Sequence, residues 1–112
     1  MPSDAAVLDR AFHALSDASR RSIVTRLSRG PASVSELAAP LDMSLSAVAQ
    51  HVDVLQRSGL VRSEKVGRVR TCRLDPAALR PVEQWIGQHR ATVEAQLDRL
   101  GDLLDETYGR NG

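Results

Sequence analysis

Apolar residues recur at spacings of three and four along most of this chain, and this pattern predicts a succession of amphipathic helices. One region departs from it, where two short β-prone runs flank a glycine-containing turn, as in a β-hairpin. The predicted helices cover about residues 4–15, 17–30, 33–40, 44–57 and 77–106, and the hairpin covers about residues 60–74. Together they predict one small domain over residues 1–108, followed by a flexible tail at 109–112.

The predicted helix at 44–57 has one apolar side and one small, polar side. Ser44 is a good N-cap, because its hydroxyl can accept a hydrogen bond from a backbone N–H one turn ahead. The stripe expected to pack against the rest of the domain consists of Leu45, Val48, Val52 and Leu55. The opposite side consists of Ser46, Ala47, Gln50 and His51. Because nothing on its first two turns is bulky or acidic, this side can approach another molecule closely, as a helix that reads a DNA groove must.

A shorter helix lies directly before it in the sequence. Ser33 and Glu36 form a capping box, in which each side chain accepts a hydrogen bond from the backbone amide of the other residue. Pro40 limits this helix, because its ring nitrogen has no hydrogen to donate back to Glu36. About four residues then lead to Ser44, and two short helices joined in this way are typical of a helix-turn-helix.

The hairpin carries the positive charge that contact with a nucleic acid requires. Its basic residues, set against the single acid Glu64, are Arg62, Lys65, Arg68, Arg70 and Arg73. A cluster of charged residues is usually just a solvent-exposed surface. This cluster flanks a helix-turn-helix, which favours contact with DNA. Residues 1–74 hold eleven basic and seven acidic side chains, whereas residues 75–112 hold four and seven. The positive half is therefore the half with the candidate reading helix.

The candidate DNA contacts divide into groups that read bases and groups that bind phosphate. The amide of Gln50 can bond an adenine edge, and the alternative is a solvated helix position. Ser46 and Ala47 lie where a phosphate or a thymine methyl would come near, and the alternative is an ordinary helix surface. His51 either hydrogen-bonds the DNA or bridges to a neighbouring turn. The full predicted set is Ser44, Ser46, Ala47, Gln50, His51, Arg57, Lys65, Arg68 and Arg70, with Arg57, like Arg20 and Arg21, a weaker candidate for phosphate.

The last predicted helix carries an apolar seam that favours packing against a partner. It begins at Asp75-Pro76, and its seam at near-heptad spacing consists of Ile86, Val93, Leu97, Leu100 and Leu104. Gly87 and Gly101 lower its intrinsic helix propensity, so its stability should come from packing. A largely helical domain of 112 residues with one Phe, one Trp and one Tyr often completes its core by pairing with a second copy.

Composition excludes several other classes of protein. No apolar run approaches the roughly 18 residues of a membrane span, and the first residues lack a basic-then-apolar signal pattern. The single cysteine, Cys72, excludes an internal disulfide and suits a reducing cytoplasm, and beside Leu74 on a strand it is expected to be buried rather than redox-active. No catalytic triad, carboxylate pair or glycine-rich phosphate loop occurs at usable spacing, so we expect no enzyme activity.

Several of these motifs together resemble the ArsR family of small bacterial winged-helix repressors, over about residues 8–80. The matching stretches are residues 12–21, 35–38, 46–55, 58–61, 67–68 and 73–76. The resemblance implies a mainly α fold with a small β-hairpin wing, in which the N-terminal helix and the long C-terminal helix form a homodimer interface. In that interface we expect Leu8 and Phe12 together with the seam of the last helix. The resemblance also implies binding to double-stranded operator DNA and repression of transcription, often of the regulator's own promoter.

The metal-sensing branches of that family use a cysteine pair in the third helix, or Asp and His pairs in the last helix. Here the third helix holds no cysteine, and His89 is the only histidine of the last helix, with Leu100 where a second would lie. Soft metals need several thiolate or imidazole ligands within tetrahedral reach. We therefore expect no metal, no cofactor and no evident small-molecule inducer. The alternatives are a metal- or thiol-responsive repressor of the same family, with a metal site that bridges a dimer, and a winged-helix module that binds only proteins.

Overall fold

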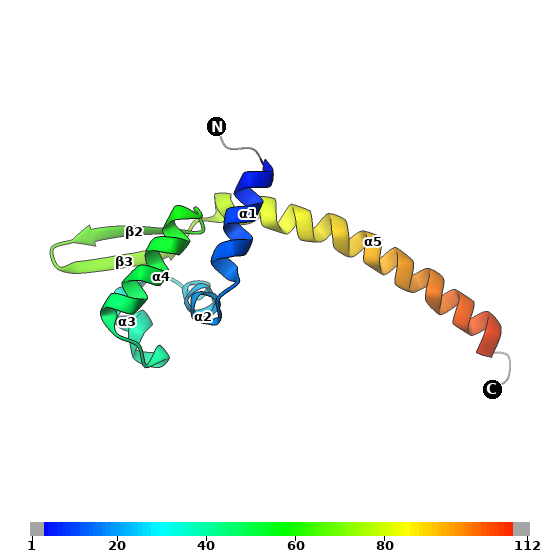
Figure 1. Cartoon of the computed structure of the whole chain (residues 1–112), viewed down its shortest axis with the longest axis horizontal. Helices are drawn as coiled ribbons and strands as arrows, with labels where there is room; N and C mark the ends of the chain where they lie inside the picture. The colour runs from blue at the N-terminus through cyan, green and yellow to red at the C-terminus, as the bar shows by residue number, and fades with distance from the viewer. Residues whose placement is uncertain (1–3, 109–112) are drawn as a thin grey trace. The chain divides into compact units, whose positions relative to one another are not determined.

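The structure is a computed structural model that describes residues 4–108 of the chain (Figure 1). Its backbone falls into two compact units, one that ends at Val82 and one that begins at Glu83. The first unit contains the predicted helix-turn-helix and hairpin, and the second contains most of the last helix. The tail predicted to be flexible, residues 109–112, lies outside the described residues. A single domain over residues 1–108 stays a prediction.

Two of the first three helices begin where short polar side chains accept hydrogen bonds from free backbone amides. Helix α1 spans Asp4–Leu15, and helix α2 spans Ala18–Leu27. Asp17 caps α2, because its Oδ2 accepts a hydrogen bond from the backbone N–H of Arg20 at 3.0 Å. Helix α3, Val34–Ala38, opens with the predicted capping box, in which the Ser33 hydroxyl accepts from the Glu36 amide and the Glu36 carboxylate accepts from the Ser33 amide. These cap predictions are confirmed.

The predicted reading helix follows α3 after one tight connection. The 3₁₀ turn η1, Ala39–Leu41, contains Pro40, and Asp42 then adopts a left-handed conformation with φ of 52°. Helix α4 spans Leu45–Arg57. Of its predicted apolar stripe, Val48, Val52 and Leu55 are buried, but Leu45 is 56% exposed, so this part of the prediction is wrong. The reason is that Leu45 lies in the first turn of α4, one turn before the first side chain of the helix that the core covers.

The predicted hairpin is present, with a turn of two residues. Strands β2, Val61–Val66, and β3, Val69–Leu74, pair antiparallel, with Val66 opposite Val69. The turn is therefore only Gly67 and Arg68, and the φ of +63° at Gly67 suits a two-residue hairpin turn. A third strand, β1, Ala32–Ser33, pairs with β3 and gives the order β1-β3-β2. The sequence could not predict β1, because two residues carry no periodic signal.

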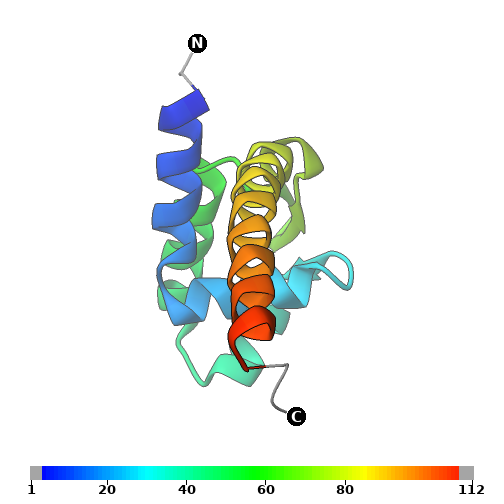
Figure 2. The same ribbon diagram turned by 90° about the vertical axis from the view of Figure 1, so that its right-hand side faces the viewer.

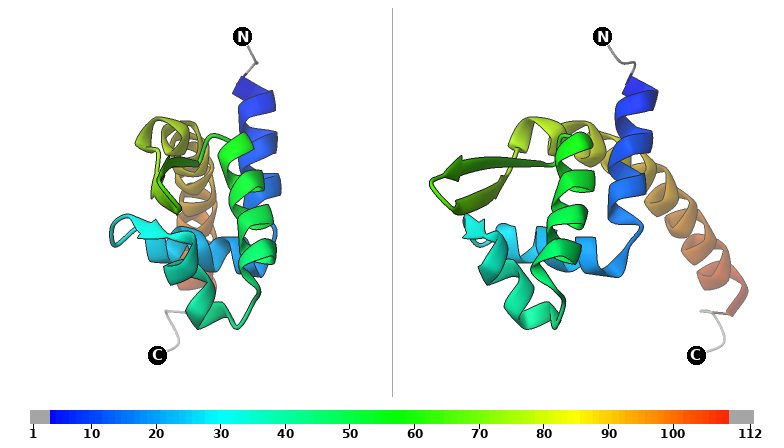
Figure 3. Two further views of the ribbon diagram at one scale, coloured as in Figure 1. Left: turned by 90° about the vertical axis from the view of Figure 1, so that its left-hand side faces the viewer. Right: turned by 60° about the vertical axis from the view of Figure 1, so that its left-hand side comes forward.

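The core of the first unit is aliphatic, as the scarcity of aromatic residues requires. Its buried residues come from all of the helices and strands, but not from η1, and they are Ala11, Ala14, Ile23, Leu27, Ala32, Leu37, Ala38, Val48, Val52, Leu55, Leu60, Val61, Cys72 and Val82. Helices α1 and α4 lie side by side, and the hairpin extends away from the helices (Figures 2 and 3). The core therefore covers one side of α4 and leaves the opposite side in solvent.

Helix α5 spans Pro76–Tyr108. Its start is capped by Asp75, whose Oδ1 accepts from the backbone N–H of Ala77 at 3.0 Å. Val82 is buried in the first unit. In the second unit, the rings of Trp85 and His89 stack with their centroids 4.0 Å apart. Within residues 4–108, no helix combines the length and the apolar character needed to cross a membrane.

Candidate nucleic-acid interface

The exposed side of α4 begins at its N-terminus, where helix geometry leaves backbone N–H groups without partners inside the helix. Ser44 Oγ accepts from one of them, the amide of Ala47, at 3.1 Å. The first turn of α4 holds no acidic side chain, so the positive end of the helix dipole faces solvent without a neutralising charge. Ser46 and Gln50 are exposed, and Ala47 is half-buried. This small surface can approach a phosphate or the edge of a base.

His51 contacts the start of α2. Its Nδ1 lies 3.4 Å from Nη1 of Arg20 and 3.9 Å from Oδ2 of Asp17. Because a guanidinium can only donate, Nδ1 accepts in this contact, and in the neutral ring Nε2 carries the hydrogen. The amide of Arg20 lowers the pKa of Asp17, and the positive charge of Arg20 lowers that pKa further. The structure thus contains the bridge to a neighbouring turn that was one of the two predicted alternatives, and contact of His51 with DNA stays a prediction.

The wing has exposed cations that are available to a ligand. Lys65 and Arg68 lie at its tip, where both are exposed and neither forms an ion pair with any other residue that the structure describes. Arg62 differs, because its Nε donates to Oδ2 of Asp75 at 2.8 Å. The pKa of Asp75 is lowered first by the hydrogen bond from the Ala77 amide and then by Arg62 and by the charge of Arg73.

Arg70, predicted to contact phosphate, is engaged within the protein. Its Nη2 donates to Oδ1 of Asp53 and to Oε1 of Gln56, each at 2.8 Å, and its Nε donates to Oγ of Ser63 at 3.0 Å. Asp53 and Gln56 belong to α4, whereas Ser63 and Arg70 belong to the wing. These contacts favour a role for Arg70 in joining the two elements over the predicted contact with DNA.

Three further arginines, predicted as weaker candidates for phosphate, lie against backbone carbonyl groups. Nε of Arg20 donates to the carbonyl of Ala14 at 2.7 Å, and Nη1 of Arg21 donates to that of Leu15 at 2.9 Å. Both carbonyl groups belong to the C-terminal end of α1, which cations stabilise. Arg57 Nε donates to the carbonyl of Asp53 at 3.4 Å, the longest of these contacts. Because this long bond is weak, Arg57 keeps its place as a proposed phosphate contact.

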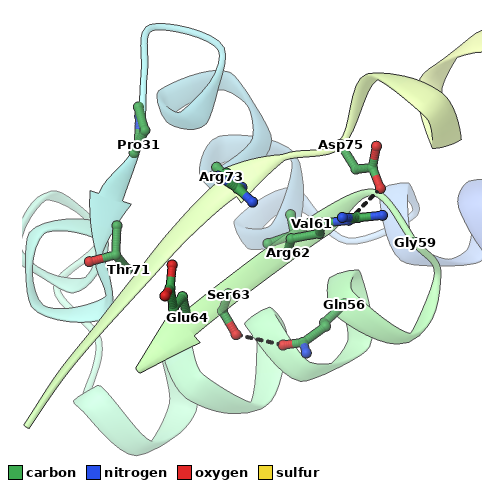
Figure 4. A pocket seen from close by; sticks show the side chains of 10 residues that line it. All are labelled: Pro31, Gln56, Gly59, Val61, Arg62, Ser63, Glu64, Thr71, Arg73 and Asp75. Carbon is green, nitrogen blue, oxygen red and sulfur yellow. Dashed lines mark hydrogen bonds and ion pairs between the residues drawn. The ribbon is translucent and has the colours of Figure 1, made fainter. Parts of the chain in front are cut away.

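A cavity of about 590 Å³ lies beside the wing, and Figure 4 shows the side chains that line it. The Arg62–Asp75 ion pair and the hydrogen bond from Ser63 Oγ to Gln56 Oε1 are part of its wall. These four polar groups already bind one another. We assign no ligand to this cavity.

Cys72 is completely buried on β3, as predicted. Burial raises the pKa of its thiol, so the reactive thiolate is disfavoured. Among residues 4–108, no group of three or more His, Cys, Asp or Glu side chains is placed so that it could hold a metal ion.

The residues predicted to form a dimer interface are described in each unit separately. In the first unit, Leu8 packs partly against the core and Phe12 is 39% exposed. In the second unit, the seam residues are all at least 41% exposed, and they are Ile86, Val93, Leu97, Leu100 and Leu104. Whether these residues meet in a dimer stays a prediction.

Comparison with known proteins identifies the family of this chain. A model of the helix-turn-helix domain family matches residues 15–64. The chain is 48% identical to the HTH-type transcriptional regulator Rv2034 of Mycobacterium tuberculosis, over 84% of this chain and 92% of that protein. It is 42% identical to the ArsR family transcriptional regulator RHA00566, whose crystal structure it matches with a TM-score of 0.74 over 84% of this chain and 97% of the other. The chain belongs to the ArsR family.

A further ArsR-like transcriptional regulator, from Rhodococcus sp. RHA1, is 36% identical, with a TM-score of 0.69 over 90% of this chain and 93% of the other. As an ArsR-family member, the chain is a DNA-binding transcriptional regulator and not an enzyme. The predicted winged helix-turn-helix fold is likewise confirmed.

Two side chains of this ArsR-family regulator lie at the candidate interface although the sequence pattern did not indicate them. Leu45 is exposed beside Ser46, and an apolar side chain there can contact the methyl group of a thymine. Asp53 binds Arg70 across 17 positions of sequence. The exposed position of Leu45 could be suspected from its place in the first turn, but nothing in the sequence pairs Asp53 with Arg70.

Proposed function

We propose that this ArsR-family regulator is a repressor that binds a specific operator sequence as a homodimer and needs no metal to do so. The observation that carries the proposal is the juxtaposition of two features within the first unit. One is the small, polar, solvent-exposed start of α4, and the other is the pair of unbound cations, Lys65 and Arg68, at the tip of the wing. A helix that enters a major groove and a basic ribbon beside it are what sequence-specific binding to a duplex requires.

In this proposal α4 reads the bases. Gln50 bonds an adenine edge through its amide, which can accept and donate at once. Ser46 bonds a base edge or a phosphate, and Ala47 lies close enough to the groove for contact with a thymine methyl. Leu45 adds a second apolar contact of the same kind. His51, with Nδ1 held by Arg20, presents its Nε2–H as a donor.

The wing supplies affinity rather than sequence preference. Lys65 and Arg68 bind phosphates on the strand beside the reading helix, and Arg57 binds a third at the C-terminal end of α4. Each neutralised phosphate releases about one counterion, so binding should weaken steeply as the salt concentration rises. Ser44 contributes by holding the first turn of α4 in the conformation that the groove meets.

The homodimer forms through α1 and α5. Leu97, at 59% exposed, is one of a row of apolar side chains along α5, and exposed rows of this kind mark interfaces in soluble proteins. Pairing of two chains would present two α4 helices to successive major grooves, about 34 Å apart along one face of the duplex. The operator should therefore contain two similar half-sites.

Repression follows if the operator overlaps a promoter, and the regulator's own promoter is the first place to look for it. The protein would act in the cytoplasm, where the DNA lies. Independence from metals and thiol oxidants is supported by two features. The acidic residue of α3, Glu36, is engaged in the capping box, and Cys72 is buried with a raised pKa.

The test is fluorescence anisotropy with labelled duplexes, one from directly upstream of the coding sequence and one with the same bases scrambled. We expect a Kd of about 10⁻⁸ to 10⁻¹¹ M for the upstream duplex at physiological salt, much weaker binding to the scrambled duplex, and two chains bound per site. A metal chelator should leave binding unchanged. Equal binding to both duplexes would overturn sequence specificity, loss of binding with chelator would overturn metal independence, and the absence of binding to any duplex would favour the protein-interaction module.

A further inference from the structure

One face of the wing lies against the core and α4. The side chains on this face change from apolar near the core to polar toward the turn. Alternate residues of a strand share a face, so Cys72 and Arg70 lie on one face of β3. Ser63 is paired with Cys72, and Val61 shares its face on β2. Val61 and Cys72 are buried in the core, whereas Ser63 and Arg70 are only half-buried. Past the core, the wing therefore meets α4 through polar side chains.

Ser63 and Arg70 form hydrogen bonds with each other and with two side chains of α4. Arg70 donates through Nη2 to Asp53 Oδ1 and Gln56 Oε1 and through Nε to Ser63 Oγ. Ser63 in turn donates its hydroxyl hydrogen to Gln56 Oε1 at 2.7 Å, the contact drawn in Figure 4. The donors and acceptors match without conflict, because Arg70 only donates, Ser63 does both, and the oxygens of Asp53 and Gln56 only accept. The amide orientation of Gln56 is fixed by this pattern.

The hydrogen bonds of Arg70 should be stronger than those of an ordinary surface ion pair. The side chain of Arg70 is 25% exposed, so solvent screens its charge less than that of a free surface arginine. A planar guanidinium also places several donors in fixed directions, so it loses little freedom for each further bond. Asp53 and Gln56 are one helical turn apart on α4, which lets one guanidinium reach both.

We propose that Asp53, Gln56, Ser63 and Arg70 form a latch that fixes the position of the wing relative to the reading helix. Arg70 is then a positioning residue of the DNA interface and not a contact to phosphate. The latch itself is a property of the free protein, whereas its effect on DNA rests on the proposed function.

The latch lies next to the two wing cations, Lys65 and Arg68, that are proposed to bind phosphate. Lys65 is the strand partner of Arg70, and Arg68 precedes Arg70 by two residues. The hydrogen bonds to α4 are thus made next to the two side chains proposed to bind phosphate. Loss of the latch would leave the tip of a two-stranded ribbon without support, and such ribbons are only marginally stable alone. The cations would then have to be ordered when DNA binds, at a cost in affinity.

The first test uses the free protein and measures amide hydrogen exchange of residues 64–70 in Asp53→Ala and Arg70→Ala. We expect exchange there to be roughly threefold to tenfold faster in both variants, with core amides of α4 unchanged. The double variant should be no faster than the faster single variant. Ala favours helix more than Asp does, so a faster wing in Asp53→Ala cannot come from a weakened α4. Unchanged exchange in both single variants would overturn the latch.

The matched control is Glu64→Ala. Glu64 is the wing's own acid, it is exposed, and it forms no ion pair with the residues that the structure describes. Its removal should leave exchange in residues 65–70 close to that of the unmodified protein. If exchange in Glu64→Ala were as fast as in Asp53→Ala, removal of any nearby carboxylate would loosen the wing. That result would also overturn the latch.

The second test measures affinity for the upstream duplex at several salt concentrations. Asp53→Ala removes a negative charge near DNA, so charge alone would raise affinity, whereas loss of the latch should lower it roughly threefold to tenfold. Arg70→Ala should lower affinity without changing the salt dependence, and Arg68→Ala should reduce the slope of log affinity against log salt by about one. A rise in affinity for Asp53→Ala, or a slope change for Arg70→Ala equal to that for Arg68→Ala, would overturn the proposal.

The two tests separate the latch from the proposed function. If the unmodified protein bound no DNA, the proposed function would fail while hydrogen exchange still tested the latch. If it bound its operator and exchange in both variants were unchanged, the latch would fail and the proposed function would stand.

Discussion

Nη1 of Arg20 lies 3.4 Å from Nδ1 of His51, so the first turn of α2 contacts α4 directly. The same guanidinium donates to the carbonyl oxygens of Ala14 at 2.7 Å and His13 at 3.2 Å. A helix end leaves its last carbonyl groups without partners inside the helix. Arg20 supplies a donor to each of these two, and the His13 carbonyl also accepts from the amide and the hydroxyl of Ser16. One side chain therefore connects α1, α2 and α4 beside the surface proposed to read DNA.

This arrangement predicts that Arg20→Ala lowers the stability of the first unit. The variant loses charge-assisted hydrogen bonds to two carbonyl groups, so we expect the free energy of unfolding to fall by about 1–3 kcal/mol. Urea denaturation followed by circular dichroism measures the change. The control is Arg29→Ala, because the side chain of Arg29 is exposed and forms no hydrogen bond or ion pair with residues 4–108; it should change stability by less than about 0.5 kcal/mol. Equal losses in the two variants would contradict the role given to Arg20.

The reading role of α4 predicts different outcomes for Gln50 and Arg68. Gln50→Ala should relax the preference at one base pair by about 1–3 kcal/mol, because a paired amide distinguishes adenine from the other bases. Arg68→Ala should weaken binding to all sequences about equally, because the phosphate backbone is the same in every DNA sequence. Competition binding against a set of operators, each changed at one base pair, measures both. Uniform loss of affinity in Gln50→Ala, with base preference intact, would rule out its assigned role.

Features that depend on neighbours in sequence could be predicted. Ser33, Ser44 and Asp17 each accept a hydrogen bond from an amide three residues ahead, so residue type and spacing were enough to place the helix starts. The buried side of α4 followed from a spacing of three and four, and it failed only at Leu45. That side chain fits the periodicity, but periodicity does not tell where along a helix the core ends.

Features that depend on pairing across the fold could not be predicted. Strand β1 exists only because Ala32 and Ser33 lie beside Cys72 and Thr71 of β3. The positive charge of Arg70 was visible in the sequence, but its partner Asp53 lies 17 positions away on another element. Charge in a sequence indicates what can bind phosphate, and only the fold tells which charges are already bound within the protein.

The proposed dimer predicts that Leu97→Asp separates the two chains. A carboxylate in an apolar seam would lose the contacts of leucine and would be buried without a partner, so the dimer dissociation constant should rise roughly a hundredfold or more. Sedimentation velocity over a range of protein concentrations measures this, and affinity for the upstream duplex should fall with it. Asp98→Asn is the control, because it lies on the same helix beside the seam but outside it. A Leu97→Asp chain that sedimented like the unmodified protein would place the interface elsewhere.

The last prediction concerns stability in acid, because three carboxylates accept backbone hydrogen bonds at helix starts. These bonds lower the pKa of Asp17 and Asp75 from 3.8 and that of Glu36 from 4.5. A group with a lowered pKa in the folded state contributes stability that is fully present above its ordinary pKa and is lost as the pH falls through the lowered value. These groups should therefore change stability little between about pH 7 and 5 and should reduce it as the pH falls below about 4.

The midpoint of thermal unfolding, followed by circular dichroism from pH 7 to about pH 2.5, measures this effect. Asp17→Asn isolates one of the three groups, because asparagine caps a helix about as well as aspartate but does not titrate. We expect its midpoint to fall less steeply below about pH 4 than that of the unmodified protein. Curves of identical steepness would mean that the hydrogen bond from the Arg20 amide to Asp17 does not depend on the charge of the carboxylate, and the link between this cap and acid stability would be wrong.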